Sequence, residues 1–191
     1  MKSELQNSKA TTLLLIDIQK GLDQWEYYGD HRNNHDAEEK MATILSHWRQ
    51  KNWPVIHVKH NSTSANSPLR TGHPGNEIKD IVYPAPHEHV IEKNVNNAFI
   101  ETSLLEDLKS LNVEDIVIIG LTTDHCVSTT ARMAGNLGFK VKVISDATAT
   151  FDKIGLSGEK YPADQVHNIA LASLNGEFCQ VVNTQNLLSQ L

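Results

Sequence analysis

Residues 115–137 combine a buried-strand pattern with a helical one, and this pairing constrains the fold more than any other feature of the chain. Four consecutive β-branched residues at 116–119 lead into Gly120, which is typical of a strand buried on both faces of a parallel sheet. Apolar and small residues then recur at helical spacing, at Val127, Thr130, Ala131, Ala134 and Leu137. A strand that leads directly into a helix is the repeating unit of an α/β fold.

The same alternation recurs along the rest of the chain. Further apolar runs lie at 13–16, 55–58, 90–91, 141–144 and 178–182, and amphipathic helical patterns cover 37–48, 104–111 and 163–174. About six strands that alternate with helices indicate a doubly wound, mostly parallel six-stranded sheet with helices on both faces. We therefore expect a three-layer α/β/α fold that forms one domain over residues 1–191.

Composition narrows the class of partner. The 191 residues are 39% hydrophobic, enough for one sizeable core, and the formal charge of −6 disfavours nucleic acid and anionic membrane surfaces. No apolar run reaches membrane-spanning length, and the first residues lack the apolar region of a signal peptide. We expect a cytoplasmic protein that acts on a small molecule, with its two cysteines as free thiols.

Cys126 occupies the position where a nucleophile is expected in such a fold. It falls in the first turn of the helix that follows Gly120, at the carboxyl end of a strand. Unpaired backbone N–H groups and the positive end of the helix dipole favour a thiolate at that point. Cys179 lies within the last apolar run, where a cysteine is most often an inert small hydrophobe, and it serves as an internal control.

Two charged residues also follow apolar runs. Asp17 ends the run at 13–16 and Lys93 follows the run at 90–91. Considered alone, Asp17 is as well explained as the cap of a turn as by a catalytic role. Lys93 alone is better explained as a surface charge. Ligands of doubly wound sheets bind outside the carboxyl ends of the strands, which brings both residues to the edge that holds Cys126. There Asp17 would take the thiol proton and later return it to a leaving amine, while Lys93 would hold the charged pair.

Several other site patterns are absent or incomplete. Haloacid-dehalogenase-type phosphatases want a second aspartate at the position of Gln19. Neither a glycine-rich dinucleotide motif, a phosphate-binding loop nor an α/β-hydrolase nucleophile elbow is present. His87 and His89 alternate as metal ligands sometimes do, but no matching cysteine or carboxylate pattern accompanies them. We therefore expect no metal site and no cofactor.

Residues 61–88 break the alternation and contain four of the six prolines. Loops of this length usually act as lids, form oligomer contacts or are disordered. Arg70 and His73 within it could bind an anionic substrate group, and they read slightly better as solvated loop residues. The sequence leaves the role of this loop open.

Three ordered motifs give the chain a specific resemblance to the isochorismatase-like cysteine hydrolase superfamily, which includes nicotinamidases and N-carbamoylsarcosine amidohydrolases. The first, an apolar strand that ends in Asp-x-Gln, resembles residues 13–19, and the second, a lysine followed by Ser-Ala-Phe, resembles Lys93 with residues 97–99. The third, Gly-x-x-Thr-x-x-Cys-Val followed by Thr-Ala, is similar to Gly120, Thr123, Cys126, Val127, Thr130 and Ala131, and Asp146 and Ala147 also fit.

The resemblance implies a site and an assembly. Asp17, Lys93 and Cys126 would be the catalytic triad, the Leu121–Thr122 bond a cis peptide, and the backbone amides of Thr122 and Cys126 an oxyanion hole. Such a hole contributes about 3 kcal/mol per donor to the stability of a tetrahedral intermediate. The resemblance further implies a homodimer or homotetramer.

The chain departs from the family patterns at two places. Asn97 stands where serine is usual, which puts a supporting or substrate contact in doubt. Nicotinamidases carry an Asp-x-His metal motif after the second strand, whereas this chain has Lys59, His60, Asn61 and Ser62. Metal-dependent nicotinamidase activity is therefore disfavoured. True isochorismatases generally lack the cysteine, so Cys126 favours attack at a carbonyl carbon over cleavage of a vinyl ether.

Together these features predict a metal-independent hydrolase that cleaves an amide, ureido or lactam-like C–N bond through a thioester on Cys126. The residues expected to bind substrate are Gln19, Trp25, Asn97, His125, Phe151 and Tyr161. Two alternatives stay open: a vinyl-ether hydrolase in which Cys126 is a bystander, and a non-catalytic binding protein that keeps the fold. The sequence does not identify the substrate, because specificity depends on loops whose structure the sequence does not predict.

Overall fold

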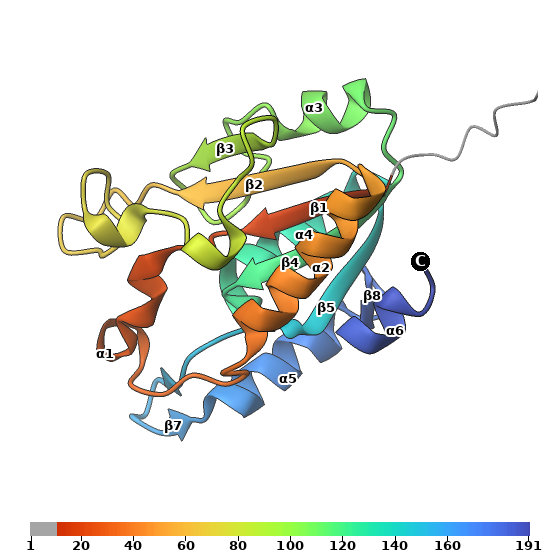
Figure 1. The fold of residues 1–191 in the computed structure, drawn as a ribbon. Coiled ribbons are helices and arrows are strands. Elements are labelled where there is room, and N and C mark those ends of the chain that lie inside the picture. The colour runs from red at the N-terminus through yellow and green to blue at the C-terminus, as the bar shows by residue number, and fades with distance from the viewer. Residues whose placement is uncertain (1–10) are drawn as a thin grey trace, which may run out of the picture.

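The computed structural model describes residues 11–191, in which six strands form one fully parallel sheet (Figure 1). The strand order is β3-β2-β1-β4-β5-β8, and the strands are β1 (Thr11–Ile16), β2 (Val55–His60), β3 (His89–Lys93), β4 (Asp115–Leu121), β5 (Lys140–Ala149) and β8 (Gln180–Val182). The prediction of a doubly wound α/β fold is confirmed. Residues 1–10 of the predicted domain lie outside the described residues, so the single domain over 1–191 stays a prediction.

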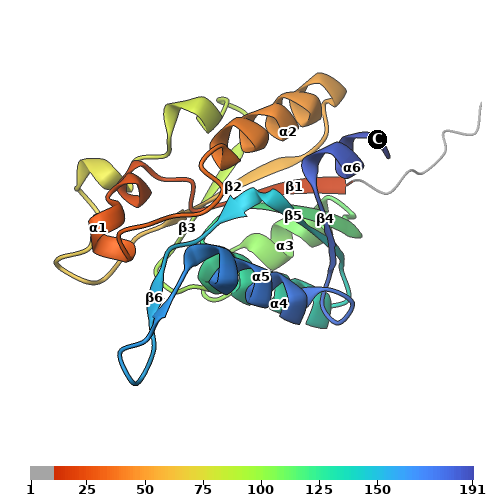
Figure 2. The same cartoon turned by 90° about the horizontal axis from the view of Figure 1, so that it is seen from below.

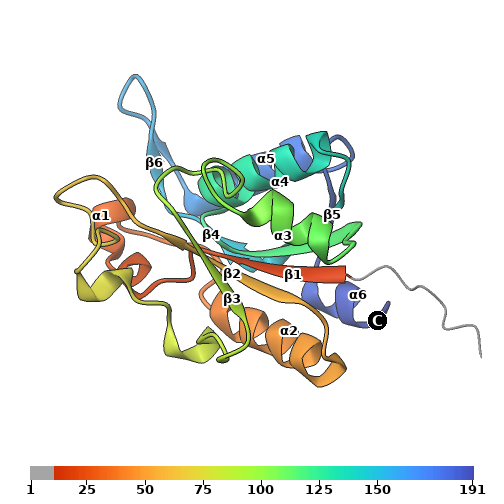
Figure 3. The ribbon, with the colours of Figure 1, turned by 90° about the horizontal axis from the view of Figure 1, so that it is seen from above.

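Helices cover both faces of the sheet (Figures 2 and 3). One face carries α2 (Ala37–Lys51) and α6 (Thr184–Leu188), and the other carries α3 (Leu104–Ser110), α4 (Ser128–Asn136) and α5 (Ala163–Leu174). Because side chains alternate along a strand, Leu13 and Leu15 of β1 pack with the core under α2, whereas Leu14 and Ile16 pack with the core on the opposite face. This two-sided burial explains the continuous apolar runs in the sequence.

The strand order reverses between β1 and β4, which places the topological switch point of the fold there. Gly120 of β4 pairs with Ile16 of β1 and has φ of 127°, a value that L side chains rarely adopt. A Cβ at Gly120 would lie 2.1 Å from the Ile16 carbonyl oxygen. Glycine is thus required for the close approach of the two strands where the chain leaves the sheet.

Some elements differ from the sequence-based expectation. Strand β5 continues through Ala149, beyond the predicted end near Asp146, because Thr148 and Ala149 pair again with β4 after an irregularity in the register. The last strand begins at Gln180 instead of residue 178. A short helix α1 (Trp25–Tyr28) and a two-stranded hairpin, β6 (Lys153–Ile154) with β7 (Lys160–Tyr161), were not expected. The hairpin projects from the body of the protein (Figure 3).

Residues 61–88 fold into turns that pack against the loop after β1. Two 3-10 turns, Pro74–Asn76 and Asp80–Val82, punctuate the segment. Between them, Lys79 is buried and pairs with Asp23 at 2.5 Å and Glu38 at 2.6 Å. The Arg70 guanidinium donates to the Ser67 carbonyl, so it is held within its own loop. None of the helices among residues 11–191 is both long and apolar enough to cross a membrane.

A buried ion pair joins α2 to the segment before β3. The Glu88 carboxylate accepts hydrogen bonds from Arg49, from His57 at 2.9 Å and from the Ala85 amide at 2.8 Å. Burial raises the pKa of Glu88, but the hydrogen bonds from Arg49, Ala85 and His57 outweigh burial and lower it to about 2. The folded state therefore holds this carboxyl ionised far more strongly than the unfolded chain does.

We predict that Glu88→Gln lowers the free energy of unfolding by about 1–3 kcal/mol near neutral pH, as expected for lost hydrogen bonds between charged groups. Because the pKa of Glu88 is depressed on folding, its contribution is complete above the unfolded value of about 4.5 and is lost as the pH falls toward 2. Urea unfolding of both proteins across this range should show the difference shrink. The exposed Glu177→Gln serves as the matched control. A difference that persists at pH 2 would contradict the assignment.

Candidate active site

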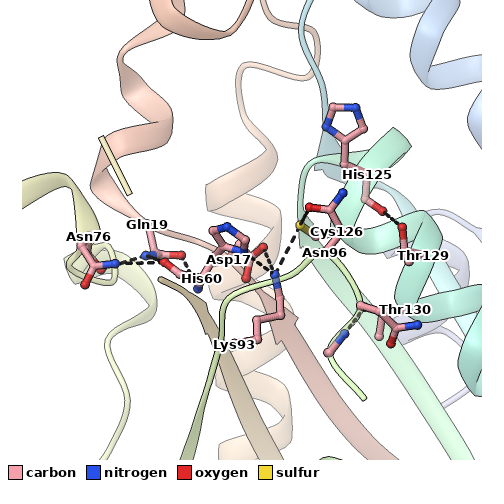
Figure 4. A network of polar contacts seen from close by, with 12 residues as sticks. Asp17, Gln19, His60, Asn76, Lys93, Asn96, His125, Cys126, Thr129 and Thr130 are labelled. Atoms are coloured by element: carbon pink, nitrogen blue, oxygen red, sulfur yellow. Dashed lines mark hydrogen bonds and ion pairs between the residues drawn. The ribbon is translucent and has the colours of Figure 1, made fainter. Parts of the chain in front are cut away.

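Four neighbouring strands bring four side chains together at their carboxyl ends (Figure 4). Three of these side chains surround the ammonium group of the fourth, Lys93. Lys93, the last residue of β3, places its Nζ 2.7 Å from Asp17 Oδ2 and 3.3 Å from Cys126 Sγ. His60, the last residue of β2, places its Nδ1 3.0 Å from the same Nζ. The structure thus brings together the three residues predicted as the catalytic triad and adds a histidine.

Cys126 sits in a π-helical turn, Thr123–Val127, between β4 and α4. The turn begins after a cis peptide bond between Leu121 and Thr122, the arrangement that the resemblance implies. The Thr122 carbonyl accepts hydrogen bonds from the amides of His125 and Val127, both at 3.2 Å. The amides expected to form the oxyanion hole lie just before this turn, at Thr122, and within it, at Cys126, and their role stays a prediction.

The side chains of the triad are buried, and their burial affects the pKa of Cys126. The Lys93 side chain is 0% exposed and that of Asp17 is 3% exposed. Among the described residues, Asp17 Oδ1 is a buried oxygen without a hydrogen-bond partner. Burial and the Asp17 carboxylate raise the pKa of the Cys126 thiol well above its ordinary value, and the Lys93 ammonium only partly opposes them. The surroundings of Cys126 therefore favour the neutral thiol over the thiolate.

The shift in the pKa of Cys126 is opposite in direction to the one expected from the helix terminus alone. The first turn after β4 is buried, and a carboxylate faces the sulfur from β1, so both effects favour the neutral thiol. Cys179, the internal control, is also buried, and burial raises its pKa to about 11. The difference between the two cysteines lies in their neighbours, because only Cys126 has a base and an ammonium beside it.

Gln19 supports the site from within the protein instead of facing a substrate. Its side chain is completely buried; its Oε1 accepts from the His60 amide at 2.8 Å, and its Nε2 donates to the His60 carbonyl at 3.0 Å. Nε2 also donates to the Asn76 carbonyl at 2.9 Å. Because both ends of the amide are engaged, the substrate contact predicted for Gln19 is corrected to a structural role that fixes His60.

Two further residues predicted to bind substrate make contacts within the protein. Phe151 is 0% exposed and stacks on Tyr28 with the ring centroids 5.1 Å apart, so it packs behind the aromatic loop. Asn97 folds back on its own loop, where its Oδ1 accepts from the Phe99 amide at 2.9 Å. The neighbouring Asn96 approaches the site instead, with its Oδ1 3.7 Å from Cys126 Sγ.

The remaining three predicted pocket residues lie in three different elements: Trp25 begins α1, His125 lies in the π-helical turn and Tyr161 ends β7. Trp25 is partly buried against the core under α2, and its indole nitrogen has no partner among the described residues. His125 is 56% exposed at its side chain and points away from Lys93 (Figure 4). Tyr161 lies on the projecting hairpin and donates to Glu159 at 2.7 Å. Substrate binding by these residues stays a prediction.

Sequence reasoning missed His60 and Asn96 as site residues. His60 carried the same signal as Lys93, because both end a strand at the same edge of the sheet. Asn96 carried no such signal, since the path of the loop after β3 brings it to the sulfur. Part of that path is fixed by Thr130 of α4, whose Oγ1 accepts from the Ala98 amide at 3.1 Å and so connects the second family motif to the third.

The donor set does not fit a divalent metal ion while Lys93 is charged. One ligand atom from each of Asp17, His60 and Cys126 lies within 4.8 Å of the others, as a metal site would require. However, Lys93 Nζ is within 3.3 Å of all three groups and supplies the positive charge that a metal would bring. A dication at this place would have to displace the ammonium against strong repulsion.

Comparisons with known proteins place the chain in a family. The sequence profile described as Isochorismatase domain matches residues 11–186. The uncharacterized isochorismatase family protein YrdC of Bacillus subtilis is 44% identical over 177 residues, covering 93% of this chain and 94% of the relative. Nicotinamidase 3 of Arabidopsis thaliana is 29% identical, covering 97% and 90%. The crystal structure of an isochorismatase-family protein from Chromobacterium violaceum has a TM-score of 0.89 and 40% identity, covering 99% and 97%.

We predict that Asp17→Asn lowers the apparent pKa of Cys126, because the substitution removes the negative charge that opposes ionisation of the thiol. Lys93→Met should instead raise the apparent pKa of Cys126 above its wild-type value, because the cation that favours the thiolate is removed. The measurement is the rate of iodoacetamide alkylation of Cys126 against pH, read by peptide mass spectrometry with Cys179 as the internal reference. An unchanged alkylation profile in Asp17→Asn would mean that the carboxylate does not act on the sulfur.

Proposed function

Because the chain belongs to the isochorismatase family, we propose that it is a cysteine hydrolase that cleaves a C–N bond of a small amide, ureido or lactam-like molecule. The observation that carries this proposal is the contact of one buried ammonium, Lys93, with both the Asp17 carboxylate and the Cys126 sulfur. A nucleophile and a base that share one cation are the parts that attack at a carbonyl carbon requires.

The first step transfers the thiol proton to Asp17 as the sulfur attacks the carbonyl carbon. Oδ2 of Asp17 is engaged by Lys93, whereas Oδ1 has no partner among the described residues and is free to receive the proton. The negative charge moves from the carboxylate to the sulfur and then to the carbonyl oxygen. Lys93 contacts both Asp17 and Cys126, so its positive charge has a negative partner as the negative charge moves from one group to the other.

The protonated Asp17 then returns its proton to the nitrogen of the tetrahedral intermediate. The C–N bond breaks, an amine or ammonia leaves, and the acyl group remains on Cys126 as a thioester. Asp17, again a carboxylate, takes a proton from water as the water oxygen attacks the thioester carbon. Collapse of the second intermediate releases a carboxylic acid, or a carbamic acid from a ureido substrate, and restores the thiol.

Two considerations favour C–N cleavage over the ether alternative. A raised thiol pKa is compatible with a nucleophile only where a base stands beside it, and Asp17 provides one. Moreover, the relative named nicotinamidase is by its name an amide hydrolase. We further propose that the substrate is a small molecule and that the protein acts as a homodimer or homotetramer.

We predict that Cys126→Ala abolishes amide turnover, with kcat/KM reduced at least ~10³-fold, because no nucleophile remains to form the thioester. Release of ammonia or amine is measured over a panel of primary amides, ureido acids and small lactams, with Cys179→Ala as the matched control. For a substrate found in this way, acid quench and intact-protein mass spectrometry should show an acyl adduct on Cys126. Full turnover by Cys126→Ala on a vinyl ether would instead support the ether hydrolase.

A further inference from the structure

The Lys93 ammonium has three N–H bonds, and three acceptors surround it. Asp17 Oδ2 lies at 2.7 Å, His60 Nδ1 at 3.0 Å and Cys126 Sγ at 3.3 Å. An ammonium donates three hydrogen bonds and accepts none. The third acceptor therefore comes from outside the predicted triad.

The contact fixes the protonation of the imidazole. Because Lys93 can only donate, Nδ1 of His60 must be the unprotonated nitrogen, which leaves the ring neutral with its hydrogen on Nε2. Burial and the charge of Lys93 lower the pKa of His60, while Asp17 and the Val95 carbonyl act in the opposite direction. The neutral ring is thus the form that both the hydrogen bond and the surroundings favour.

Contacts of its backbone fix the position of His60, independently of the hydrogen bond between its ring and the Lys93 ammonium. The two residues are register partners on the adjacent parallel strands β2 and β3. The His60 amide donates to Gln19, and its carbonyl accepts from both Gln19 at 3.0 Å and Asn76 at 2.9 Å. Figure 4 shows these side chains in a row that leads to the ammonium. Both backbone polar groups at the end of β2 are therefore held by buried side chains.

We propose that His60 is a positioning residue that directs the Lys93 ammonium toward Asp17 and Cys126 through the hydrogen bond to Nδ1. The proposal rests on the proposed function of the triad. With the third N–H held by His60, the other two point at the carboxylate and the sulfur. Without that acceptor, the buried ammonium must turn to satisfy its third donor, at the expense of one of the two catalytic contacts.

The same geometry separates this role from that of a metal ligand. A ring nitrogen that accepts a hydrogen bond from Lys93 has no lone pair left for a metal ion. If His60 were instead a ligand together with Asp17 and Cys126, Lys93 would have to leave the centre of the cluster. The two roles predict opposite responses to metals, so metal addition is one arm of the test.

The kinetic test compares His60→Leu, which removes the acceptor, with His60→Asn, whose Oδ1 stands near the place of Nδ1. On a substrate found with the panel, His60→Leu should lower kcat on the order of 10- to 100-fold with little change in KM, the size of one hydrogen bond to a charged group. His60→Asn should recover most of this loss. The exposed His89→Asn, at the opposite end of β3, is the matched control.

The pH profile separates positioning from a merely structural role. The charged groups that face His60 are Lys93 from β3, Asp17 after β1 and the ionisable Cys126 after β4. Protonation of His60 removes the acceptor, so wild-type activity should fall as the pH drops through the pKa of His60. Asparagine does not titrate, so this acid limb should move to lower pH in His60→Asn. An unmoved acid limb would overturn the proposal.

A second measurement needs no substrate and stands even if the protein is not an amidase. Nitrogen-15 NMR of the wild-type imidazoles, with the His60 signals assigned by their loss in His60→Asn, should show His60 as the neutral ring protonated at Nε2. Lys93→Met should raise the pKa of His60, because a nearby cation is removed. A ring protonated at Nδ1, or shifts of the His60 signals when Zn²⁺ is added to the EDTA-treated protein, would overturn the proposal.

Discussion

The buried ammonium of Lys93 is the interaction on which the site depends. A charge without exposure is costly unless hydrogen-bonded partners surround it, and Lys93 has a carboxylate, an imidazole and a thiol within 3.3 Å. Each partner follows a different strand, so the four strand ends must keep their relative positions for the charge to be tolerated. In the proposed reaction, the same contacts keep Lys93 beside both groups that exchange the proton, Cys126 and Asp17.

The sheet supplies the rigidity that these contacts need. Reversal of the strand order between β1 and β4 opens the edge where Asp17 and Cys126 emerge, and Gly120 allows the two strands to approach there. Several family-motif residues make hydrogen bonds that serve this requirement. Gln19 fixes the end of β2, Thr130 fixes the loop after β3, and Asp146 accepts two hydrogen bonds from Thr184 at the start of α6.

The raised pKa of Cys126 matches the role proposed for Asp17. A thiol that does not ionise readily needs a neighbouring base to become a nucleophile, and in the proposed reaction Asp17 accepts its proton. The ammonium also takes the place that a metal ion would fill in a cluster of aspartate, histidine and cysteine.

The sequence by itself determined the α/β architecture and three residues at one edge of the sheet. Apolar runs and helical spacing are local patterns, and the carboxyl ends of parallel strands necessarily share an edge, so Asp17, Lys93 and Cys126 could be placed together without coordinates. Only the tertiary structure decided the direction of the pKa shift of Cys126, the third acceptor of Lys93 and the inward roles of Gln19 and Phe151. These properties depend on burial and on neighbours from distant segments, which no local pattern encodes.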